Sequence, residues 1–450
     1  MVTEEIEEEI KKYKRNHGKS LQLWEQAKMK IPGGVSHNIR DFHMNDFNLG
    51  PPFIERAFDS RLEDVDGNIY IDYWITHGAA ILGHAHKNII EAISNQLPKG
   101  NHHGMVNKQA IDLAERIIDA TSSIEKLRFC TTGTEATMYA SRLARAYTNK
   151  KKIAKIRGGW HGGNDTLFYF VKEVEKGDES KGMRTQEEAE ILSFDYNDTE
   201  GAIRLINENK KTLAAVVMEP VLGAGGAIPP RKGFLETIRE ETEKNDILLI
   251  YDEIITGFRL SYHSAQGFFD VTPDITTMGK IIGGGAPIGV IGGQADILDQ
   301  ANLPAGGEVW IGGGTFSSNS ISMVSGIATL DTLKQGGDSL YKNLNDTGEY
   351  IRKEINKILE KYNAPAMVTG VGSMISIHWF QEKQKEIFSG SEIKLNLDKK
   401  KVSQYQLLMF NRDILVRGGL GYLSIKHTQE QIEKTLNAID ETTKIVVENI

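Results

Sequence analysis

Cysteine is almost absent from the sequence, which has a single one, Cys130, among 450 residues. One cysteine excludes an intrachain disulfide and any metal site built from several cysteines. The chain also lacks an apolar run long enough to span a membrane, and its charged first residues, MVTEEIEEEIKKYKRN, lack the apolar core of a secretory signal. We therefore expect a cytoplasmic protein without a membrane partner.

Positive charge is in the minority. Lys and Arg together number 53 against 61 Asp and Glu, which gives a formal net charge of −8. The sequence has no basic stripe, so a nucleic-acid partner is not expected. Two histidine pairs, His84 with His86 and His102 with His103, have no acidic or cysteine ligand at zinc-like spacing nearby. The sequence therefore predicts no metal site.

Length and composition are typical of a folded enzyme with more than one domain. Hydrophobic residues make up 40% and charged residues 25% of the 450, and a chain of this length exceeds one usual hydrophobic core. We predict three parts. Residues 1–60 form an N-terminal segment that packs with the small domain, residues 61–330 form a large ligand-binding domain, and residues 331–450 form a smaller C-terminal α+β domain.

Helices and apolar strands alternate through the middle of the chain. Strands are predicted at 127–130, 152–156, 213–218 and 246–251, and helices at 87–97, 108–121, 134–148 and 233–243. This order predicts an α/β fold with a mostly parallel, doubly wound sheet, whose ligands bind beyond the carboxyl ends of the strands. A β-hairpin is predicted around Asp66-Gly67. Outside the sheet, helices are predicted at 4–30, 331–361 and 428–449.

A lysine and an acid are predicted to meet at that edge of the sheet. Lys280 follows the short predicted strand 274–278 among glycines, which allow a ligand to approach closely. A lysine there can act as a nucleophile, although most lysines are solvated on the surface. Asp252 follows the apolar strand ILLIY, and a buried acid needs a cationic partner, for which a protonated pyridine nitrogen is suited.

Three further segments allow two interpretations each. The turn 131–134 at the head of a long helix can hold a phosphate with its backbone N–H groups, or it can be a simple capping turn. Trp160, at the end of a predicted strand, can stack on a flat heterocycle or belong to the core. The polar stretch 172–184, KEVEKGDESKGMR, predicts a mobile lid or a plain solvated loop.

Eight motifs, in this order, resemble those of the class III, fold-type I aminotransferases, and most of all the glutamate-1-semialdehyde 2,1-aminomutase group. They are IPGGV (31–35), YIDYW…ILGHAH (70–86), TGTEA (132–136), WHGG (160–163), MEPV (218–221), YDEIITGFR (251–259), GKIIGGG (279–285) and GGTFSSN (313–319). The resemblance extends from about Ile31 to Ile439. It implies an enzyme that binds pyridoxal 5′-phosphate in a large, mostly parallel-sheet domain beside a smaller α+β domain.

The resemblance also implies roles for single residues. Lys280 forms a C=N bond with the cofactor, Asp252 pairs with its pyridine nitrogen, and Trp160 stacks on its ring. The cofactor site further includes Gly133 and Thr134 at the phosphate, together with His161, Glu219 and Ile254. Thr315 reaches the phosphate of the neighbouring subunit, which implies a homodimer. The stretch 172–184 falls in the family's gating loop.

The substrate side departs from the aminomutase group. That group usually has a serine, a tryptophan and a late glutamate where this chain has His37, His77 and Gly419, whereas Arg40 matches the group's substrate-side arginine. Arg417 adds a second guanidinium suited to a carboxylate.

These differences favour an amino acid or β-amino acid donor and a 2-oxo acid acceptor. Glutamate-1-semialdehyde 2,1-aminomutation, racemisation or epimerisation, and cofactor binding without turnover remain alternatives. A dehydrogenase is not expected, because no predicted strand leads into G-x-G-x-x-G.

Overall fold

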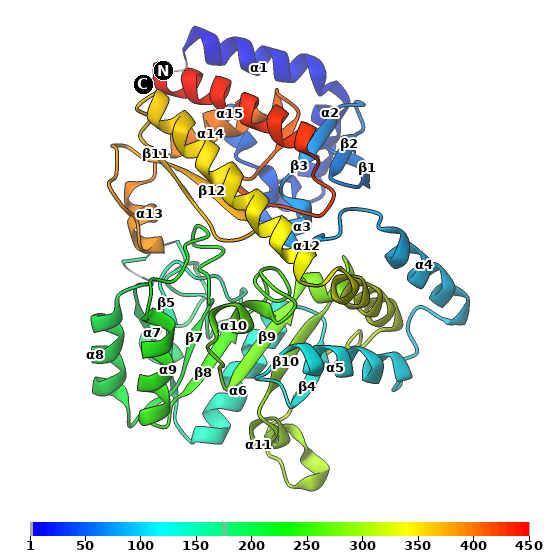
Figure 1. Ribbon diagram of the computed structural model, residues 1–450, viewed down its shortest axis with the longest axis vertical. Helices are drawn as coiled ribbons and strands as arrows, with labels where there is room; N and C mark the ends of the chain where they lie inside the picture. The colour runs from blue at the N-terminus through cyan, green and yellow to red at the C-terminus, as the bar shows by residue number, and fades with distance from the viewer. Residues whose placement is uncertain (1–2, 173, 176, 178, 450) are drawn as a thin grey trace. The chain divides into compact units, whose positions relative to one another are not determined.

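The computed structural model describes residues 3–449 except 173, 176 and 178 (Figure 1). The chain divides into two compact units. The small unit comprises Met1–His86, Leu344–Glu386 and Asn396–Ile450, and the large unit comprises Lys87–Asn343 and Ile387–Leu395. The predicted division into 1–60, 61–330 and 331–450 stays a prediction.

A seven-stranded sheet forms the centre of the large unit, in the order β4-β10-β9-β8-β7-β5-β6. Its strands are β4 (Lys126–Cys130), β5 (Lys152–Ile156), β6 (Ile191–Phe194), β7 (Leu213–Met218), β8 (Leu248–Asp252), β9 (Ile275–Gly279) and β10 (Gly289–Gly293). Neighbouring strands are parallel except at β10, which is antiparallel to both β4 and β9. The predicted mostly parallel α/β sheet is confirmed, and the antiparallel strand was not predicted.

Helices cover this sheet so completely that every residue of β7 and β8 is buried. The helices of the large unit are α4 (Lys87–Gln96), α5 (Lys108–Ala120), α6 (Gly133–Thr148), α7 (Gln186–Ala189), α8 (Thr199–Asn209), α9 (Phe234–Lys244), α10 (Ser264–Phe269) and α11 (Ala295–Leu298). Helix α6 packs against the four strands from β7 to β10, and α9 packs against β8. Short 3-10 turns are η4 (Leu97–Lys99), η5 (Lys280–Gly283), η6 (Asp299–Ala301) and η7 (Leu303–Ala305).

Helix α12 (Ser320–Lys361) begins in the large unit and ends in the small one, and Gly337 interrupts its helical geometry with φ 55° and ψ −158°. The sequence predicted this helix from residue 331 only. Its first turns are rich in serine, and these hydroxyls bond to the glycine-rich loop after β9: Ser322 donates to the carbonyl of Pro287, and Ser325 to that of Gly284. Tertiary hydrogen bonds therefore extend the helix beyond what local propensity predicts.

The small unit has two sheets. One has the order β1-β2-β3-β13, with strands Ile54–Phe58, Arg61–Asp64, Ile69–Asp72 and Ile414–Leu415, and the other is β11-β12-β14, with strands Ala366–Thr369, Met374–Trp379 and Leu420–Tyr422. Antiparallel β2 and β3 confirm the hairpin around Asp66-Gly67.

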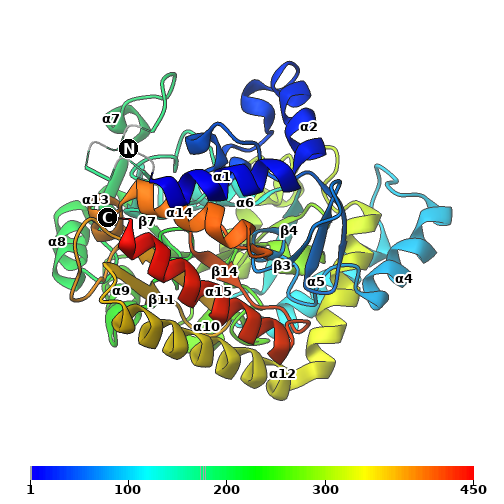
Figure 2. The ribbon, with the colours of Figure 1, turned by 90° about the horizontal axis from the view of Figure 1, so that it is seen from above.

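The helices of the small unit are α1 (Glu4–Asn16), α2 (Gly18–Lys28), α3 (Ile75–Gly78), α14 (Lys399–Phe410) and α15 (Gln429–Glu448), with the 3-10 turns η1 (Pro32–Gly34), η2 (Asn38–Asp41) and η3 (Met44–Phe47). Helix α14 packs against both α1 and α15 (Figure 2). A further short helix, α13 (Gly390–Asn396), falls almost entirely in the large unit. The predicted helix 4–30 is interrupted at His17, whose backbone is not helical and whose buried ring bonds to the carbonyl of Tyr13 and the hydroxyl of Tyr70.

The stretch 172–184 is more closely packed than its polarity predicts. Val174 is buried, Met183 packs against the core of the large unit, and the Glu179 carboxylate accepts the N–H groups of Val171 and Lys172. Its polarity suggests that the stretch cannot pack, and the structure shows that this expectation is wrong at Val174 and Met183. Residues 173, 176 and 178 lie outside the described residues. A gating role for the stretch stays a prediction.

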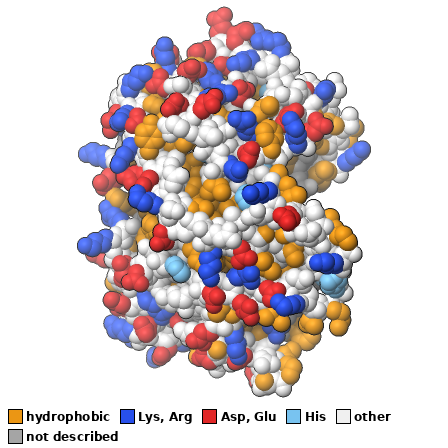
Figure 3. All heavy atoms as spheres, turned by 45° about the vertical axis from the view of Figure 1, so that its right-hand side comes forward, with side chains coloured by type: hydrophobic (Ala, Val, Ile, Leu, Met, Phe, Trp, Pro, Cys, Tyr) orange, Lys and Arg blue, Asp and Glu red, His pale blue; other side chains and the backbone are white. Residues whose placement is uncertain are grey.

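The surface mixes both signs of charge. On the face drawn in Figure 3, Lys and Arg side chains alternate with Asp and Glu, and hydrophobic side chains lie between them. Among the helices that the structure describes, none combines the length and the apolar composition that a bilayer span needs.

Candidate active site

Lys280 lies directly after β9, at the carboxyl edge of the large sheet. Its φ of 49° places it in the left-handed region, which costs a residue with a side chain roughly 1–3 kcal/mol and is typical of functional sites. Its amine donates no hydrogen bond to the described residues. Burial lowers the pKa of this amine to about 8, the Arg259 guanidinium acts in the same direction, and the carboxylates of Asp252 and Glu219 oppose them. Roughly a tenth of the amine is therefore neutral and nucleophilic at pH 7, far more than in an ordinary lysine.

Asp252 ends β8, the strand beside β9, and its carboxylate is only 4% exposed. Oδ1 accepts the backbone N–H of Ile254 at 3.0 Å and the hydroxyl of Thr277 at 3.3 Å, and Oδ2 lies 2.7 Å from Nδ1 of His161. Burial lowers the pKa of His161, so its imidazole is neutral and donates Nδ1–H to the acid. The negative charge of Asp252 is therefore hydrogen-bonded but not neutralised by His161.

Glu219 and Trp160 line the same edge. Glu219 follows β7, and its Oε2 accepts the N–H groups of Gly223 at 3.0 Å and Ala224 at 3.3 Å. Its other oxygen accepts the backbone N–H of Trp160 at 3.3 Å. Burial, reinforced by the charge of Asp252, raises the pKa of Glu219 to about 8. The Trp160 side chain is 36% exposed, so an indole face remains accessible.

The N-terminus of α6 has both a cap and unused donors. The Thr132 hydroxyl accepts the N–H of Glu135, and the Glu135 carboxylate accepts the N–H groups of Thr131 and Thr132. The N–H groups of Gly133 and Thr134 have no acceptor among the described residues. The capping turn is therefore present, and it leaves unused the two donors that were predicted to hold a phosphate.

Glycines allow the head of α6, Ile254 and the residue before Lys280 to lie close together. A Cβ at Gly133 would lie 3.0 Å from the Ile254 side chain, and one at Gly279 would lie 3.2 Å from the same atom. Ile254 therefore lies between the head of α6 and the residue before Lys280. Gly162, with φ 89°, lies so close to Thr134 that a Cβ would come within 2.4 Å of its hydroxyl.

The large unit thus brings together most of the predicted cofactor residues: Lys280, Asp252, His161, Glu219, Trp160, Ile254, Gly133 and Thr134. Thr315 is exposed, next to Gly314, where a Cβ would be 3.3 Å from Glu135. Thr277 was missed by the sequence analysis. The pairing of β8 with β9 places Thr277 directly beside Asp252. Thr277 could have been found from the alternation of side chains along a strand, because it lies two residues before Gly279 and therefore on the same face of β9.

The small unit contains the predicted substrate residues. The rings of His37 and His77 are 5.6 Å apart, Trp74 lies 4.3 Å from His77, and the Arg417 guanidinium lies 5.8 Å from the Trp74 ring. Arg417 donates from Nε to the carbonyl of Ile39, and its other donors have no acceptor among the described residues.

Arg40, the other predicted substrate residue, is exposed and forms no ion pair with the described residues, and its role stays a prediction. Trp74 belongs to the motif YIDYW, but no role was predicted for it.

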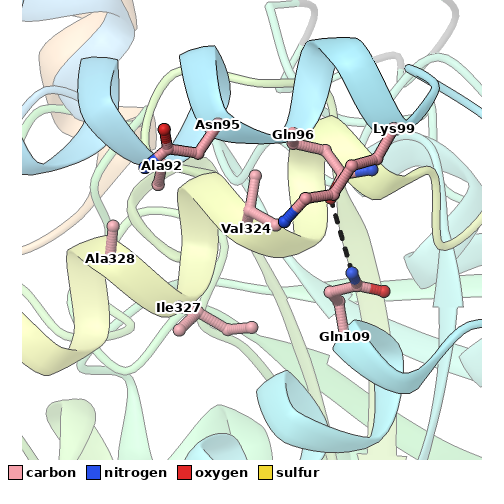
Figure 4. Close-up of a pocket in the computed structure, with 8 residues that line it drawn as sticks. All are labelled: Ala92, Asn95, Gln96, Lys99, Gln109, Val324, Ile327 and Ala328. Atoms are coloured by element: carbon pink, nitrogen blue, oxygen red, sulfur yellow. Dashed lines mark hydrogen bonds between the residues drawn. The ribbon is translucent and has the colours of Figure 1, made fainter.

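A separate cavity of about 270 Å³ lies in the large unit between α4, the start of α5 and α12 (Figure 4). Val324 and Ile327 from α12 face Gln96 and Lys99, and Gln109 donates to the side chain of Gln96. None of its lining residues is a predicted site residue, so this cavity is not the site described above.

Known proteins resemble this chain in sequence and in structure. Residues 45–404 match the class-III aminotransferase family. Glutamate-1-semialdehyde 2,1-aminomutase of Methanosarcina acetivorans is 40% identical over 431 residues, which cover 93% of this chain and 97% of that protein. An omega-transaminase of Sphaerobacter thermophilus has a TM-score of 0.86 at 29% identity, covering 95% of this chain and 97% of its own. A β-phenylalanine aminotransferase of Variovorax paradoxus has a TM-score of 0.87 at 27% identity, covering 97% and 96%.

These similarities confirm the expected fold-type I α/β class, the expected enzyme class and pyridoxal 5′-phosphate as the cofactor. They also support small-molecule amino substrates. The 40% identical relative is named an aminomutase, the reaction that was predicted as an alternative, whereas the two structural neighbours are named a transaminase and an aminotransferase, the reaction type that was predicted first. The homodimer and the roles of single residues stay predictions.

Proposed function

Because the chain belongs to the class-III aminotransferase family, we propose that it moves an amino group on a carboxylate-bearing substrate by pyridoxal phosphate chemistry, with Lys280 as the catalytic amine. The observation that supports this proposal is that Lys280 and Asp252 lie at the carboxyl ends of two neighbouring strands. A lysine with a lowered pKa follows β9, and a buried, un-neutralised carboxylate ends β8. Such a pair suits a ligand with a carbonyl group at one end and a ring nitrogen at the other.

The residues present fit this cofactor. When bound, pyridoxal phosphate supplies an aldehyde that condenses with amines and a protonated ring that withdraws electrons. The N–H groups of Gly133 and Thr134 would hold its phosphate, Asp252 would keep its ring nitrogen protonated, and Trp160 and Ile254 would enclose its ring. His161 and Glu219 would orient Asp252 and the backbone of Trp160.

Lys280 would also act as the proton carrier. With a pKa of about 8, its Nζ can accept a proton from the substrate carbon and return it, because the neutral and charged forms are both populated near neutral pH. The glycines around Lys280 would leave space for the amine to move. Arg417 would hold a substrate carboxylate with the donors that have no acceptor among the described residues.

We propose glutamate-1-semialdehyde 2,1-aminomutation as the reaction, supported by the 40% identical relative of that name. Intermolecular transfer from an amino acid or β-amino acid to a 2-oxo acid is the second candidate. His37 and His77, which replace a serine and a tryptophan of the aminomutase group, favour it, because they alter the substrate side while the cofactor residues match.

The two candidates differ in what they consume. We would incubate the holoenzyme with glutamate-1-semialdehyde alone, and separately with β-phenylalanine or glutamate plus a 2-oxo acid. Formation of 5-amino-4-oxopentanoate without a second substrate supports aminomutation, and a new keto acid supports intermolecular transfer. An inverted stereocentre with no amino transfer would indicate a racemase. Lys280→Ala should abolish turnover, whereas the exposed Lys232→Ala should not; full activity of Lys280→Ala would contradict the proposal.

The enzyme is also proposed to be a cytoplasmic homodimer in which Thr315 contributes to the partner's phosphate site. Support comes from exposed apolar side chains of the large unit, Met105 at 74%, Val106 at 94%, Trp310 at 69% and Phe316 at 59%. Such side chains are typical of a surface that another chain covers.

Co-refolding tests this sharing of sites. Heterodimers of Lys280→Ala with Thr315→Ala chains would regain one intact site if Thr315 acts on the partner, and none if it acts on its own chain. Activity that does not exceed that of the separate variants would refute the shared site.

A further inference from the structure

Lys155 is a fully buried lysine that the proposed reaction does not use. It lies in β5, between Ala154 and Ile156, and its exposed fraction is 0%. A lysine is almost never buried in this way unless its charge is matched by partners. Its partners therefore indicate why the strand contains it.

The amine of Lys155 bonds to three backbone carbonyls. Its Nζ lies 2.8 Å from the oxygen of Gly159, 3.1 Å from that of Leu167 and 2.7 Å from that of Tyr169. An ammonium has three donors, so it satisfies all three acceptors. A side chain without donors would leave three buried carbonyls unpaired, which is strongly unfavourable.

These carbonyls belong to both ends of one segment, 157–171, which leaves β5 and folds back against it. The N–H of Gly158 donates to the carbonyl of Phe170 at 2.7 Å and closes the same loop. Between these ends lie Trp160, whose N–H bonds to Glu219, and His161, whose ring bonds to Asp252. The segment that Lys155 ties together is therefore the one that presents the indole and the imidazole.

The charge surroundings suit an ammonium at this place. The carboxylates of Glu179, Glu219 and Asp252 all favour the charged form, while burial lowers the pKa of Lys155 to about 7. Glu179 also accepts two N–H groups at the end of the same segment, from Val171 and Lys172. Acidic side chains that follow the segment in the chain therefore favour the ammonium against the effect of burial.

We propose that Lys155 is a positioning residue for the cofactor site: its ammonium binds both ends of segment 157–171 and thereby fixes Trp160 and His161 relative to Asp252. The inference rests on the proposed function for the roles of Trp160 and His161. The fixing of the segment itself follows from the three hydrogen bonds and can be measured without cofactor or substrate.

Hydrogen–deuterium exchange of the apoprotein tests whether Lys155 fixes segment 157–171. In Lys155→Met, amides of 157–171 should exchange at least about tenfold faster than in the wild type, the factor that corresponds to one lost hydrogen bond of ordinary strength. Lys152→Met removes a partly exposed lysine of the same strand, and Lys401→Met removes a buried lysine of the small unit. Neither control should change exchange in 157–171. Exchange in Lys155→Met within twofold of the wild type overturns the proposal.

Cofactor affinity and kinetics show whether Lys155 positions the cofactor site or only stabilises the fold. Lys155→Met should bind pyridoxal phosphate at least about tenfold more weakly and lose at least about tenfold in kcat, with KM for the amino substrate little changed, because the predicted substrate residues lie in the other unit. Values within twofold of those for Lys401→Met would overturn the proposal.

If Lys155→Met does not fold, Lys155→Gln replaces it in both measurements. Its amide has two donors for three carbonyls, so exchange in 157–171, cofactor affinity and kcat should change in the same direction but by less. Wild-type behaviour of Lys155→Gln overturns the proposal. If the wild type proves to have no amino-transfer activity, the proposed function fails, and the exchange and cofactor-affinity measurements still decide on Lys155.

Discussion

The protonation of Lys280 gives the sharpest test of the site, because it follows from burial and from charges in one compact unit. With a pKa of about 8, roughly a tenth of the amine is neutral at pH 7, compared with about three parts in ten thousand for an ordinary lysine at 10.5. The neutral, reactive form should therefore be roughly 300-fold more abundant than in a surface lysine. We would vary the pH of the apoprotein and follow the reactivity of Lys280.

The assay is competitive labelling with trace acetic anhydride, followed by mass spectrometry of the peptide that contains Lys280. Only neutral amines react, so the labelling rate should rise about tenfold per pH unit below the midpoint and level off above about pH 8. A free lysine peptide with the ordinary pKa of about 10.5 serves as the reference, and its labelling rate should still be rising at pH 9. A midpoint for Lys280 at or above that of the reference peptide would refute the reasoning.

Charge substitutions check the cause of the shift. The Asp252 carboxylate favours the charged form of Lys280, so Asp252→Asn should move the labelling midpoint to lower pH. Glu253→Gln changes an adjacent buried acid that does not act on Lys280, and it should leave the midpoint in place. A midpoint that rises in Asp252→Asn would show that the carboxylate and the amine are not coupled as described.

Three further predictions concern Gly162, Glu219 and Arg417. Gly162→Ala should weaken binding of pyridoxal phosphate at least about tenfold, because a Cβ there meets Thr134 at the phosphate end; Gly163→Ala, where a Cβ meets nothing, should bind normally in the same fluorescence titration. The raised pKa of Glu219 means that the folded apoprotein binds more protons than the unfolded chain between about pH 4.5 and 8. Stability should therefore fall as pH rises through this window, and Glu219→Gln should flatten that slope in urea titrations; an equal slope in both proteins contradicts the assignment. Arg417→Ala should raise KM for carboxylate substrates at least about tenfold without changing cofactor affinity, and unchanged KM would show a structural role.

Strand ends made the meeting of most of the proposed cofactor residues predictable from the sequence. Asp252 follows the continuously apolar stretch ILLIY, and Lys280 follows the short predicted strand 274–278; the carboxyl ends of parallel neighbours must meet at one edge. The unused N–H groups proposed to hold a phosphate were predictable from the turn before α6, because a helix start leaves unused N–H groups wherever it occurs.

Strand β10 and the role of Lys155 depend on tertiary contacts, which the sequence does not reveal. Strand β10, GVIGG, is three-fifths glycine and has no clear strand pattern. It nevertheless fits between β4 and β9 because these glycines lack side chains: a Cβ at Gly289 or Gly292 would collide with neighbouring atoms. Lys155 interrupts the apolar strand KIAKI, which was a visible signal. Its three acceptors are carbonyls, however, and backbone positions cannot be read from side-chain types.

Burial alone does not distinguish the acid that we propose to bind the cofactor from its neighbour, since Asp252, the last residue of β8, and Glu253, which follows it, are both buried. The distinction lies in their hydrogen bonds. A carboxylate can accept about four. Glu253 accepts four, from the N–H groups of Ala265 and Gln266, the Gln266 side chain and the Thr256 hydroxyl, so it is saturated as a structural anchor.

Asp252 accepts three, from Ile254, Thr277 and a neutral His161, and so it retains both its charge and room for one further donor. A protonated ring nitrogen is a donor of that kind, with the positive charge that His161 does not supply. We therefore expect the adjacent acids to differ in function, because the chain fills the hydrogen-bonding capacity of Glu253 and leaves one position at Asp252 for a cationic ligand.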